Sequence, residues 1–150
     1  MRVTIQRVKE ASVLIDNKIK SEIKKGLVVF LGISPDDSHE DVKWLCKKIC
    51  CLRIFPDVNY KMNKSLIDSG GEVLLISQFT LFASTKKGNR PSHIRSAPPR
   101  IAFPLYESFH SCLEQLLGKE VAAGKFGADM KVSLCNDGPV TINIDSKIRE

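Results

Sequence analysis

The first third of the chain alternates apolar and polar residues in a way that predicts paired β-strands. Residues 1–8 place Val3 and Ile5 on one face and polar residues on the other, which is the pattern of a half-buried strand. A second alternating run, over 12–23, is interrupted once by an Asn-Lys dipeptide and predicts a hairpin. The run over 27–33 is continuously apolar and predicts a central strand covered on both faces.

Helical periodicity appears in two later segments. A turn with helix-cap residues precedes a helix predicted over about 39–52, and a second helix is predicted over 102–117. Between them, residues 56–71 are rich in turn formers and predict a loop, and the apolar run 72–76 predicts a second buried strand. The glycine-bearing segment 118–129 is expected to be irregular around a short strand.

A Gly-Pro corner, Gly138-Pro139, interrupts the last apolar segment. Proline has no backbone N–H and is excluded from central strands, so the corner must lie at a sheet edge, a bulge or a strand junction. We therefore predict two strands, 130–135 and 140–144, that flank the corner. The order of elements predicts an α/β fold: one domain over 1–150, with a mixed β-sheet, antiparallel hairpins and two main helices packed on it.

Composition and charge narrow the classes of function. The chain has 150 residues, a net charge of +6 and a sequence pI near 9.1, which weakly favours a polyanionic partner. No apolar stretch approaches the roughly 20 residues of a membrane span. The N-terminal pattern is not that of a signal peptide. We therefore expect a cytoplasmic protein with no membrane partner.

The five cysteines predict neither a disulfide framework nor a metal site. Their number is odd, and Cys46, Cys50 and Cys51 are crowded into one segment. The spacings of the cysteines and histidines do not match those of zinc ligands. We expect reduced packing residues, no metal and no organic cofactor.

Two short segments carry the candidate chemistry. Residues 77–81 (Ser-Gln-Phe-Thr-Leu) end a predicted buried strand, where backbone N–H groups and short side chains are presented to ligands. They include no acid, base or thiol, so a Ser77 or Thr80 nucleophile lacks an adjacent base; the plainer interpretation is that both hydroxyls hydrogen-bond backbone. Residues 136–141 (Asn-Asp-Gly-Pro-Val-Thr) surround the corner, and alone they are compatible with an ordinary tight turn.

These two segments stand among others in an order and spacing that resemble the D-aminoacyl-tRNA deacylases, enzymes that remove D-amino acids and glycine wrongly esterified to tRNA. The resemblance runs from Arg7 to about Ser146. The further segments that carry it are Lys61-Met62-Asn63, Gly70-Gly71-Glu72, Lys87-Gly88-Asn89-Arg90-Pro91-Ser92, Ala97-Pro98-Pro99 and Phe126-Gly127-Ala128-Asp129-Met130. It implies a hydrolase that binds aminoacyl-tRNA, cleaves its ester bond and proofreads chirality in translation.

The resemblance also implies a site that two subunits of a homodimer build together. The residues expected at the pocket are Ser77, Gln78, Phe79 and Thr80 as its floor, with Phe126 and Met130 lining it. Gly138-Pro139, joined by a cis bond, would reach into the partner's pocket. There its carbonyl groups would hold the substrate's α-amino group and leave no room for an L side chain, whereas a D side chain would point outward.

Two chemical routes stay open at this pocket. The backbone N–H groups of Phe79 and Thr80 could stabilise the oxyanion of the tetrahedral intermediate. The resemblance suggests that the 2′-hydroxyl of the terminal adenosine then assists hydrolysis. The rival route uses Thr80 as a covalent nucleophile.

A basic, proline-bearing connection over 84–100 follows the first segment. Its Lys86, Lys87 and Arg90 are expected to contact phosphates of the tRNA acceptor stem. The alternative is a solvated loop with no partner. His93, at the end of this basic stretch, stands where the family usually has phenylalanine, and it could alter the pocket rim or the tRNA contact.

The sequence leaves two other functions to be weighed. A non-enzymatic nucleic-acid-binding module would account for the charge, but the aromatic residues are scattered and do not form a stacking platform. A related tRNA editor with a different chirality or substrate preference would share most of the segments. The unbroken segments 77–81 and 136–141 favour the D-specific type.

Overall fold

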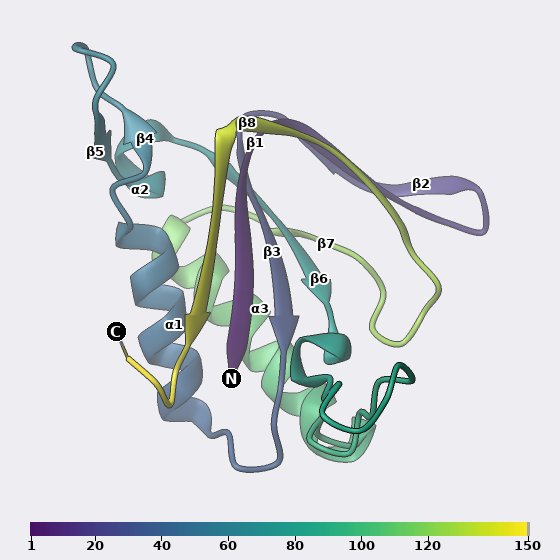
Figure 1. Ribbon diagram of the computed structural model, residues 1–150. Coiled ribbons are helices and arrows are strands. Elements are labelled where there is room, and N and C mark those ends of the chain that lie inside the picture. The colour runs from purple at the N-terminus through teal and green to yellow at the C-terminus, as the bar shows by residue number, and fades with distance from the viewer. Residues whose placement is uncertain (150) are drawn as a thin grey trace.

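A long N-terminal strand organises the sheet in the computed structural model, which describes residues 1–149. The main strands are β1 (Arg2–Ile15), β2 (Lys18–Ile23), β3 (Gly26–Gly32), β6 (Glu72–Ser77), β7 (Ala122–Ala123) and β8 (Lys131–Asp145). The sheet order is β2-β1-β3-β6-β7, and β8 runs antiparallel along the other edge of β1 (Figure 1). Because β3 and β6 are parallel and the β1 pairs are antiparallel, the mixed sheet confirms the predicted α/β class.

The two predicted central strands are confirmed. Residues 27–33 correspond to β3 and 72–76 to β6, and their register pairs Leu27 with Val73 and Leu31 with Ser77. Leu27, for example, has no exposed surface at all. The continuous apolar run therefore reports burial on both faces, as expected for parallel strands.

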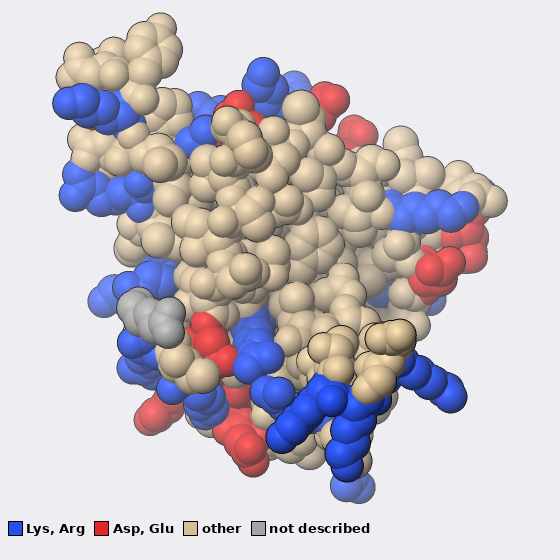
Figure 2. Space-filling model, in the orientation of Figure 1, with Lys and Arg blue, Asp and Glu red and all other residues tan. Residues whose placement is uncertain are grey.

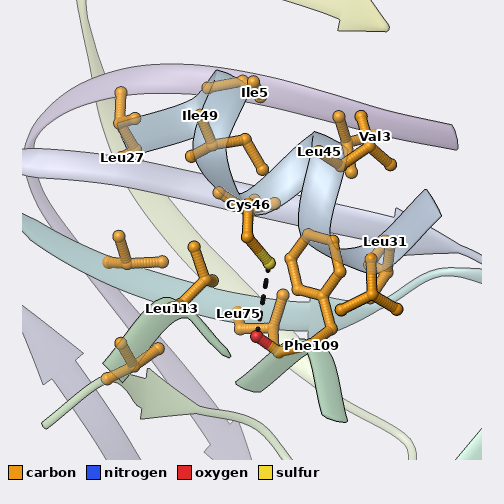
Figure 3. Close-up of a cluster of buried hydrophobic side chains, with 14 of the residues drawn as sticks. Val3, Ile5, Leu27, Leu31, Leu45, Cys46, Ile49, Leu75, Phe109 and Leu113 are labelled. Carbon is orange, nitrogen blue, oxygen red and sulfur yellow. Dashed lines mark hydrogen bonds between the residues drawn. The ribbon is translucent and has the colours of Figure 1, made fainter. Parts of the chain in front are cut away.

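The helices cover one face of this sheet (Figure 1). They are α1 (His39–Cys51), the single turn α2 (Leu66–Ser69) and α3 (Pro99–Leu117). Figure 3 shows Cys46 of α1 among the apolar side chains of the core, where its Sγ donates to the Phe109 carbonyl of α3 at 3.5 Å. Burial raises the pKa of this thiol, and all five cysteines are free. No helix within residues 1–149 has both the length and the apolar character that a membrane crossing needs.

A second, smaller cluster covers the other face of the central strands. Val13 of β1, Val28 of β3 and Leu74 of β6 are buried in it, and Met130 and Val132 pack against it from the start of β8. The second half of β1, with β2 and the first half of β8, therefore turns over the sheet and makes it barrel-like. The first half of β1 keeps an open face.

The strand boundaries differ from the prediction where pairing is long-range. The runs 1–8 and 12–16 form one strand, β1, because β8 pairs with both halves of it. The hairpin turn lies at Asp16 and Asn17, both with positive φ, one residue earlier than predicted. The predicted strands 130–135 and 140–144 are likewise a single strand, β8.

The connecting segments also carry more structure than predicted. The expected loop 56–71 contains most of a small hairpin of β4 (Phe55–Pro56) and β5 (Met62–Lys64), followed by α2. Helix α3 starts at Pro99, three residues earlier than expected, because proline suits the first turn of a helix. The short strand expected near residue 121 is β7.

Candidate active site

The carboxyl end of β6 delivers the first predicted segment to the surface. The Gln78 N–H donates to the Leu31 carbonyl at 2.7 Å, after which the chain leaves the sheet in a single 3-10 turn, η1 (Phe79–Phe82). Arg2 stabilises this turn, because its Nη1 donates a hydrogen bond to the Leu81 carbonyl at 3.1 Å. Neither the Phe79 nor the Thr80 N–H donates a hydrogen bond to any described residue. Two adjacent backbone donors are therefore free at the end of a rigid strand.

A cavity of about 500 Å³ lies beside this turn, a size suited to a small-molecule group. Its walls come from the ends of β3 and β6, the segment 93–102 around the start of α3, and the turn 126–132. The predicted residues found in its lining are Ser77, Gln78, Phe79, Phe126 and Met130. The structure thus places these five residues around one cavity, with one predicted residue as an exception.

Thr80 is that exception. It is exposed and does not line the cavity. Its hydroxyl accepts a hydrogen bond from Gln78 Nε2, and among residues 1–149 no imidazole or carboxylate bonds to it. A hydroxyl without a base is a weak nucleophile. The Thr80 hydroxyl therefore lacks, within the described chain, the adjacent base that a covalent nucleophile needs, and the Thr80 N–H stays free.

Phe79 is positioned by two residues of the following loop. Ser96 Oγ donates to the Phe79 carbonyl at 2.8 Å, and the His93 ring meets the Phe79 ring edge to face with 4.9 Å between centroids. The Nδ1 atom of His93 is buried without a hydrogen-bond partner in the described chain. Sequence reasoning marked His93 as a departure but missed Ser96, since a serine in a polar loop carries no distinguishing signal.

The far wall of the cavity rests on aromatic packing. The Phe126 ring lies 5.4 Å from that of Phe103 and 5.5 Å from that of Tyr106. Tyr106 is held by a long hydrogen bond of 3.4 Å to the Leu75 carbonyl, and burial raises its pKa to about 12. Gly124 packs closely against Met130, because a Cβ there would lie 2.3 Å from the Met130 sulfur. Phe126 is therefore held by aromatic contacts, and Met130 packs beside it in the lining of the cavity.

The Gly138-Pro139 corner does not belong to this cavity. β8 pairs Thr141 with Gln6 and Asn136 with Val8, so the corner falls in a bulge of β8 opposite Arg7. This confirms that proline sits on an edge strand at a bulge, and the Gly138-Pro139 bond is cis. Both residues are exposed and neither lines the cavity. The two predicted segments are therefore separate within one chain.

Arg7 holds the corner in place. Its Nε donates to the Asp137 carbonyl at 3.0 Å and lies 3.6 Å from the Asp137 carboxylate, and its Nη1 donates to the Ile54 carbonyl. Gly138 has φ of +129°, and a Cβ there would lie 2.9 Å from Arg7 Nη2. Sequence reasoning gave Arg7 no role. A signal was present in the sequence, because Arg7 follows Val3 and Ile5 at the inward-facing positions of the alternating strand. A cation at such a position indicates a buried polar contact.

The predicted tRNA-contact residues sit on an exposed loop beside the cavity. Lys86, Lys87 and Arg90 are exposed, and mutual backbone hydrogen bonds between Ser84 and Ser92, of 2.8 and 2.9 Å, close the loop that carries them. Figure 2 shows basic side chains gathered at the lower right, below the largely uncharged middle of the face. The chain reaches the cavity wall directly after this loop.

The site offers polarised backbone hydrogen-bond donors. Within residues 1–149, no group of three or more His, Cys, Asp or Glu side chains is placed to hold a metal ion. The two free N–H groups suit an oxygen that gains negative charge, such as the carbonyl oxygen of an ester under attack by water.

Comparison with known proteins agrees with this chemistry. The D-Tyr-tRNA(Tyr) deacylase family matches residues 4–145. D-aminoacyl-tRNA deacylases of Bacteroides fragilis (strain YCH46) and Flavobacterium psychrophilum are 61% and 60% identical over 150 residues, the full length of both chains in each comparison.

Two solved structures share the fold. The c-Myc DNA Unwinding Element Binding Protein superposes with a TM-score of 0.91 at 38% identity, over 97% of this chain and 98% of that one. A probable eukaryotic D-amino acid tRNA deacylase superposes with a TM-score of 0.79 at 17% identity, over 95% and 98%. With the family match and the relatives above, these findings show that the chain belongs to the D-Tyr-tRNA(Tyr) deacylase family.

Proposed function

We propose that this protein hydrolyses the ester bond that joins a D-amino acid to tRNA and releases the free D-amino acid and tRNA. The observation that carries the proposal is the cavity at the end of β6, with the free N–H groups of Phe79 and Thr80 at its edge. The names of the relatives support the substrate class. Such an activity proofreads chirality in translation. Because translation takes place in the cytoplasm, we expect the protein there.

The chemistry needs little from side chains. An aminoacyl ester is already activated, so a placed water and two donors for the tetrahedral oxyanion suffice for acceleration. A general base for the attacking water is still useful, and residues 77–81 carry no imidazole, carboxylate or thiol that could serve. The neighbouring 2′-hydroxyl of the terminal adenosine is the group of the substrate best placed to assist. Water is then the nucleophile, and no covalent enzyme intermediate forms.

In this proposal, the Gly138-Pro139 corner of a second subunit discriminates D from L substrates. Gly138-Pro139 is exposed at a fixed corner of an edge strand, and the middle of the open sheet face beside it carries little charge (Figure 2). We assign this face to a homodimer in which each corner enters the partner's cavity. Backbone carbonyls there accept hydrogen bonds from the substrate's α-ammonium group. An L side chain clashes with the inserted backbone, whereas a D side chain or the hydrogen of glycine does not.

The remaining part of the substrate is RNA, including mischarged glycyl-tRNA as a second ester. Lys86, Lys87 and Arg90 are free in the described chain to contact phosphates of the acceptor stem. Charge reversal of these residues is expected to raise KM and to weaken its dependence on salt. Hydrolysis needs no cofactor in this scheme.

The deciding experiment mixes the purified protein with matched D-tyrosyl-, L-tyrosyl- and glycyl-tRNA in the presence of EDTA and follows loss of each ester. Rapid loss of the D ester and the glycyl ester, with the L ester intact, is the expected result. It would establish the activity, the chirality filter and independence from chelatable metal together. Equal loss of D and L esters would contradict the filter.

A second candidate function is nucleic-acid binding without hydrolysis. The exposed basic loop favours it, because those cations would bind RNA with or without chemistry. Binding of tRNA without loss of any ester in the same experiment would select this candidate over the hydrolase.

A further inference from the structure

The β4–β5 hairpin, residues 55–64, has an exposed tip that neither the core nor the cavity uses. It projects from the body of the molecule on the side where β8 bends (Figure 1). Tyr60 at its tip is 92% exposed, Val58 85% and Met62 60%. Three large, strongly exposed apolar side chains within five residues are typical of a surface that contacts another molecule.

The tip is rigid although it is exposed. The Asp57 carboxylate accepts the N–H groups of Asn59 and Lys61 at 2.8 and 3.1 Å and the Asn63 side-chain amide at 3.1 Å. The Tyr60 N–H closes the turn by donating to the Asp57 carbonyl at 3.1 Å. Tyr60 is held at φ of 60°. A preformed loop with an aromatic tip loses little conformational entropy when it binds.

Positive charge surrounds this tip. Lys61 and Lys64 are exposed, and the exposed Arg53 is oriented by a hydrogen bond from its Nε to the Asn63 carbonyl at 2.8 Å. Figure 2 shows Lys and Arg side chains gathered below the uncharged tip at the upper left. An exposed aromatic ring flanked by cations matches unpaired nucleotides, which offer a base face for stacking and a phosphate for each cation.

Arg7 ties the hairpin to the Gly138 corner. The same guanidinium donates to the Ile54 carbonyl, directly before β4, and to the Asp137 carbonyl, directly before Gly138. The base of the hairpin is therefore fixed relative to the corner. If the corner occupies the partner's cavity, as proposed above, the hairpin of the same subunit lies beside that cavity.

We infer that the hairpin of one subunit binds the unpaired 3′ end and the acceptor stem of the tRNA whose ester lies in the partner's cavity. Tyr60 stacks on an unpaired base, while Lys61 and Lys64 contact phosphates. This inference rests on the proposed function and its homodimer. It gives the RNA two basic surfaces, the 84–92 loop of one subunit and the hairpin of the other.

The first test measures the contribution of the Tyr60 ring to steady-state deacylation of D-tyrosyl-tRNA. Tyr60→Ala raises KM about ten-fold or more at unchanged kcat, whereas Tyr60→Phe keeps the ring and stays within about two-fold of the wild type. Because the side chain is exposed, the melting temperature does not change for either variant. Equal KM values for Tyr60→Ala and Tyr60→Phe overturn the stacking role.

The charge test uses a matched pair of double reversals. K61E/K64E raises KM and lowers the slope of log KM against log salt by roughly 0.7–0.9 for each lost phosphate contact. K18E/K20E, on the exposed strand β2, changes the net charge equally and leaves KM as in the wild type. The same KM for both double variants overturns the phosphate contacts.

A complementation test decides whether the hairpin acts on the partner's cavity. Ala128→Trp, which fills the cavity with an indole and is first verified as inactive, is co-expressed with Tyr60→Ala under a different affinity tag. The heterodimer has one intact cavity served by an intact hairpin from the other subunit, so its KM returns to the wild-type value. A KM as high as that of the Tyr60→Ala homodimer overturns the inference.

The wild-type protein in these assays distinguishes a failure of the hairpin inference from a failure of the proposed function. No hydrolysis of D-tyrosyl-tRNA by the wild type contradicts the proposed function itself. Normal hydrolysis by the wild type with unaffected hairpin variants contradicts the hairpin inference and leaves the proposed function standing.

Discussion

The cavity and the Gly138-Pro139 corner are both rigid, but only the cavity has a ligand space within its own chain. The cavity is assembled from four parts of the chain, and its Phe79 is fixed by Ser96 and packed against His93. The corner is held by hydrogen bonds of the Arg7 and Asn136 side chains and faces solvent. Exposed backbone that is held so firmly is typical of a part that acts on another molecule. Only the cavity offers space for a ligand within this chain, whereas the corner, in the homodimer proposed above, acts on the cavity of a second subunit.

The largest effect is expected where the corner itself changes. Gly138→Val puts a branched Cβ at φ of +129°, 2.9 Å from Arg7 Nη2 and from Val140 Cγ2, a conformation that β-branched residues avoid. We expect deacylation of D-tyrosyl-tRNA to fall about a thousand-fold or more, or about 4 kcal/mol in the barrier. The measurement is kcat/KM, with circular dichroism to verify the fold. Activity within ten-fold of the wild type would contradict the role of the corner.

Removing the support of the corner should cost less than deforming it. Arg7→Ala leaves the carbonyls of Ile54 and Asp137 without their donor, and each unpaired buried group costs about 1–3 kcal/mol. We expect a lower free energy of unfolding and a fall of about a hundred-fold in kcat/KM, since small misplacements have that effect. Chemical denaturation and steady-state kinetics measure the two separately.

The control for this variant is Arg7→Lys. Lysine keeps the charge but cannot bridge two carbonyls with a planar fork, so it should restore stability better than activity. An Arg7→Ala variant that is destabilised yet fully selective for D over L esters would show that the corner does not need its support.

Most of the fold can be predicted from local sequence pattern, because the spacing of apolar residues indicates buried strands and amphipathic helices. The segments 27–33 and 72–76 and the two main helices are of this kind. The continuity of β8 across its bulge is not local, since it depends on pairing with β1 more than a hundred residues away. Sequence pattern therefore predicts two strands where the structure has one.

The candidate site divides in the same way. Residues 77–79, Phe126 and Met130 were predictable because a strand end and recognisable segments carry them, and the structure brings them around one cavity. Arg7 and Ser96 act through hydrogen bonds across 130 and 17 residues of sequence, which no local pattern encodes. Thr80 lies in the single turn η1 and is exposed, so only its backbone N–H is available at the edge of the cavity.

On the cavity side, a support residue should matter less than Arg7 does for the corner. Ser96→Ala removes the hydrogen bond to the Phe79 carbonyl, and the cavity retains its other walls. We expect kcat/KM to fall about ten-fold, equivalent to about 1.4 kcal/mol, with a change in unfolding free energy within about 1 kcal/mol. Ser111→Ala, on the exposed side of α3, is the matched control and should change neither. An unchanged kcat/KM for Ser96→Ala would mean that Phe79 holds its position without it.

The smallest effect is expected at Thr80, the one predicted floor residue whose side chain is not part of the cavity lining. Thr80→Ala removes a hydroxyl that bonds only to the Gln78 amide and keeps the backbone N–H assigned to the oxyanion. Loss of a true nucleophile costs about 10⁴-fold or more, whereas we expect kcat to fall less than about five-fold here. The measurement is single-turnover hydrolysis of D-tyrosyl-tRNA, with a search for an acyl-enzyme in acid-quenched samples. A collapse of kcat, or acyl transfer to the wild-type protein, would replace the water mechanism with a covalent one and make the backbone donors secondary.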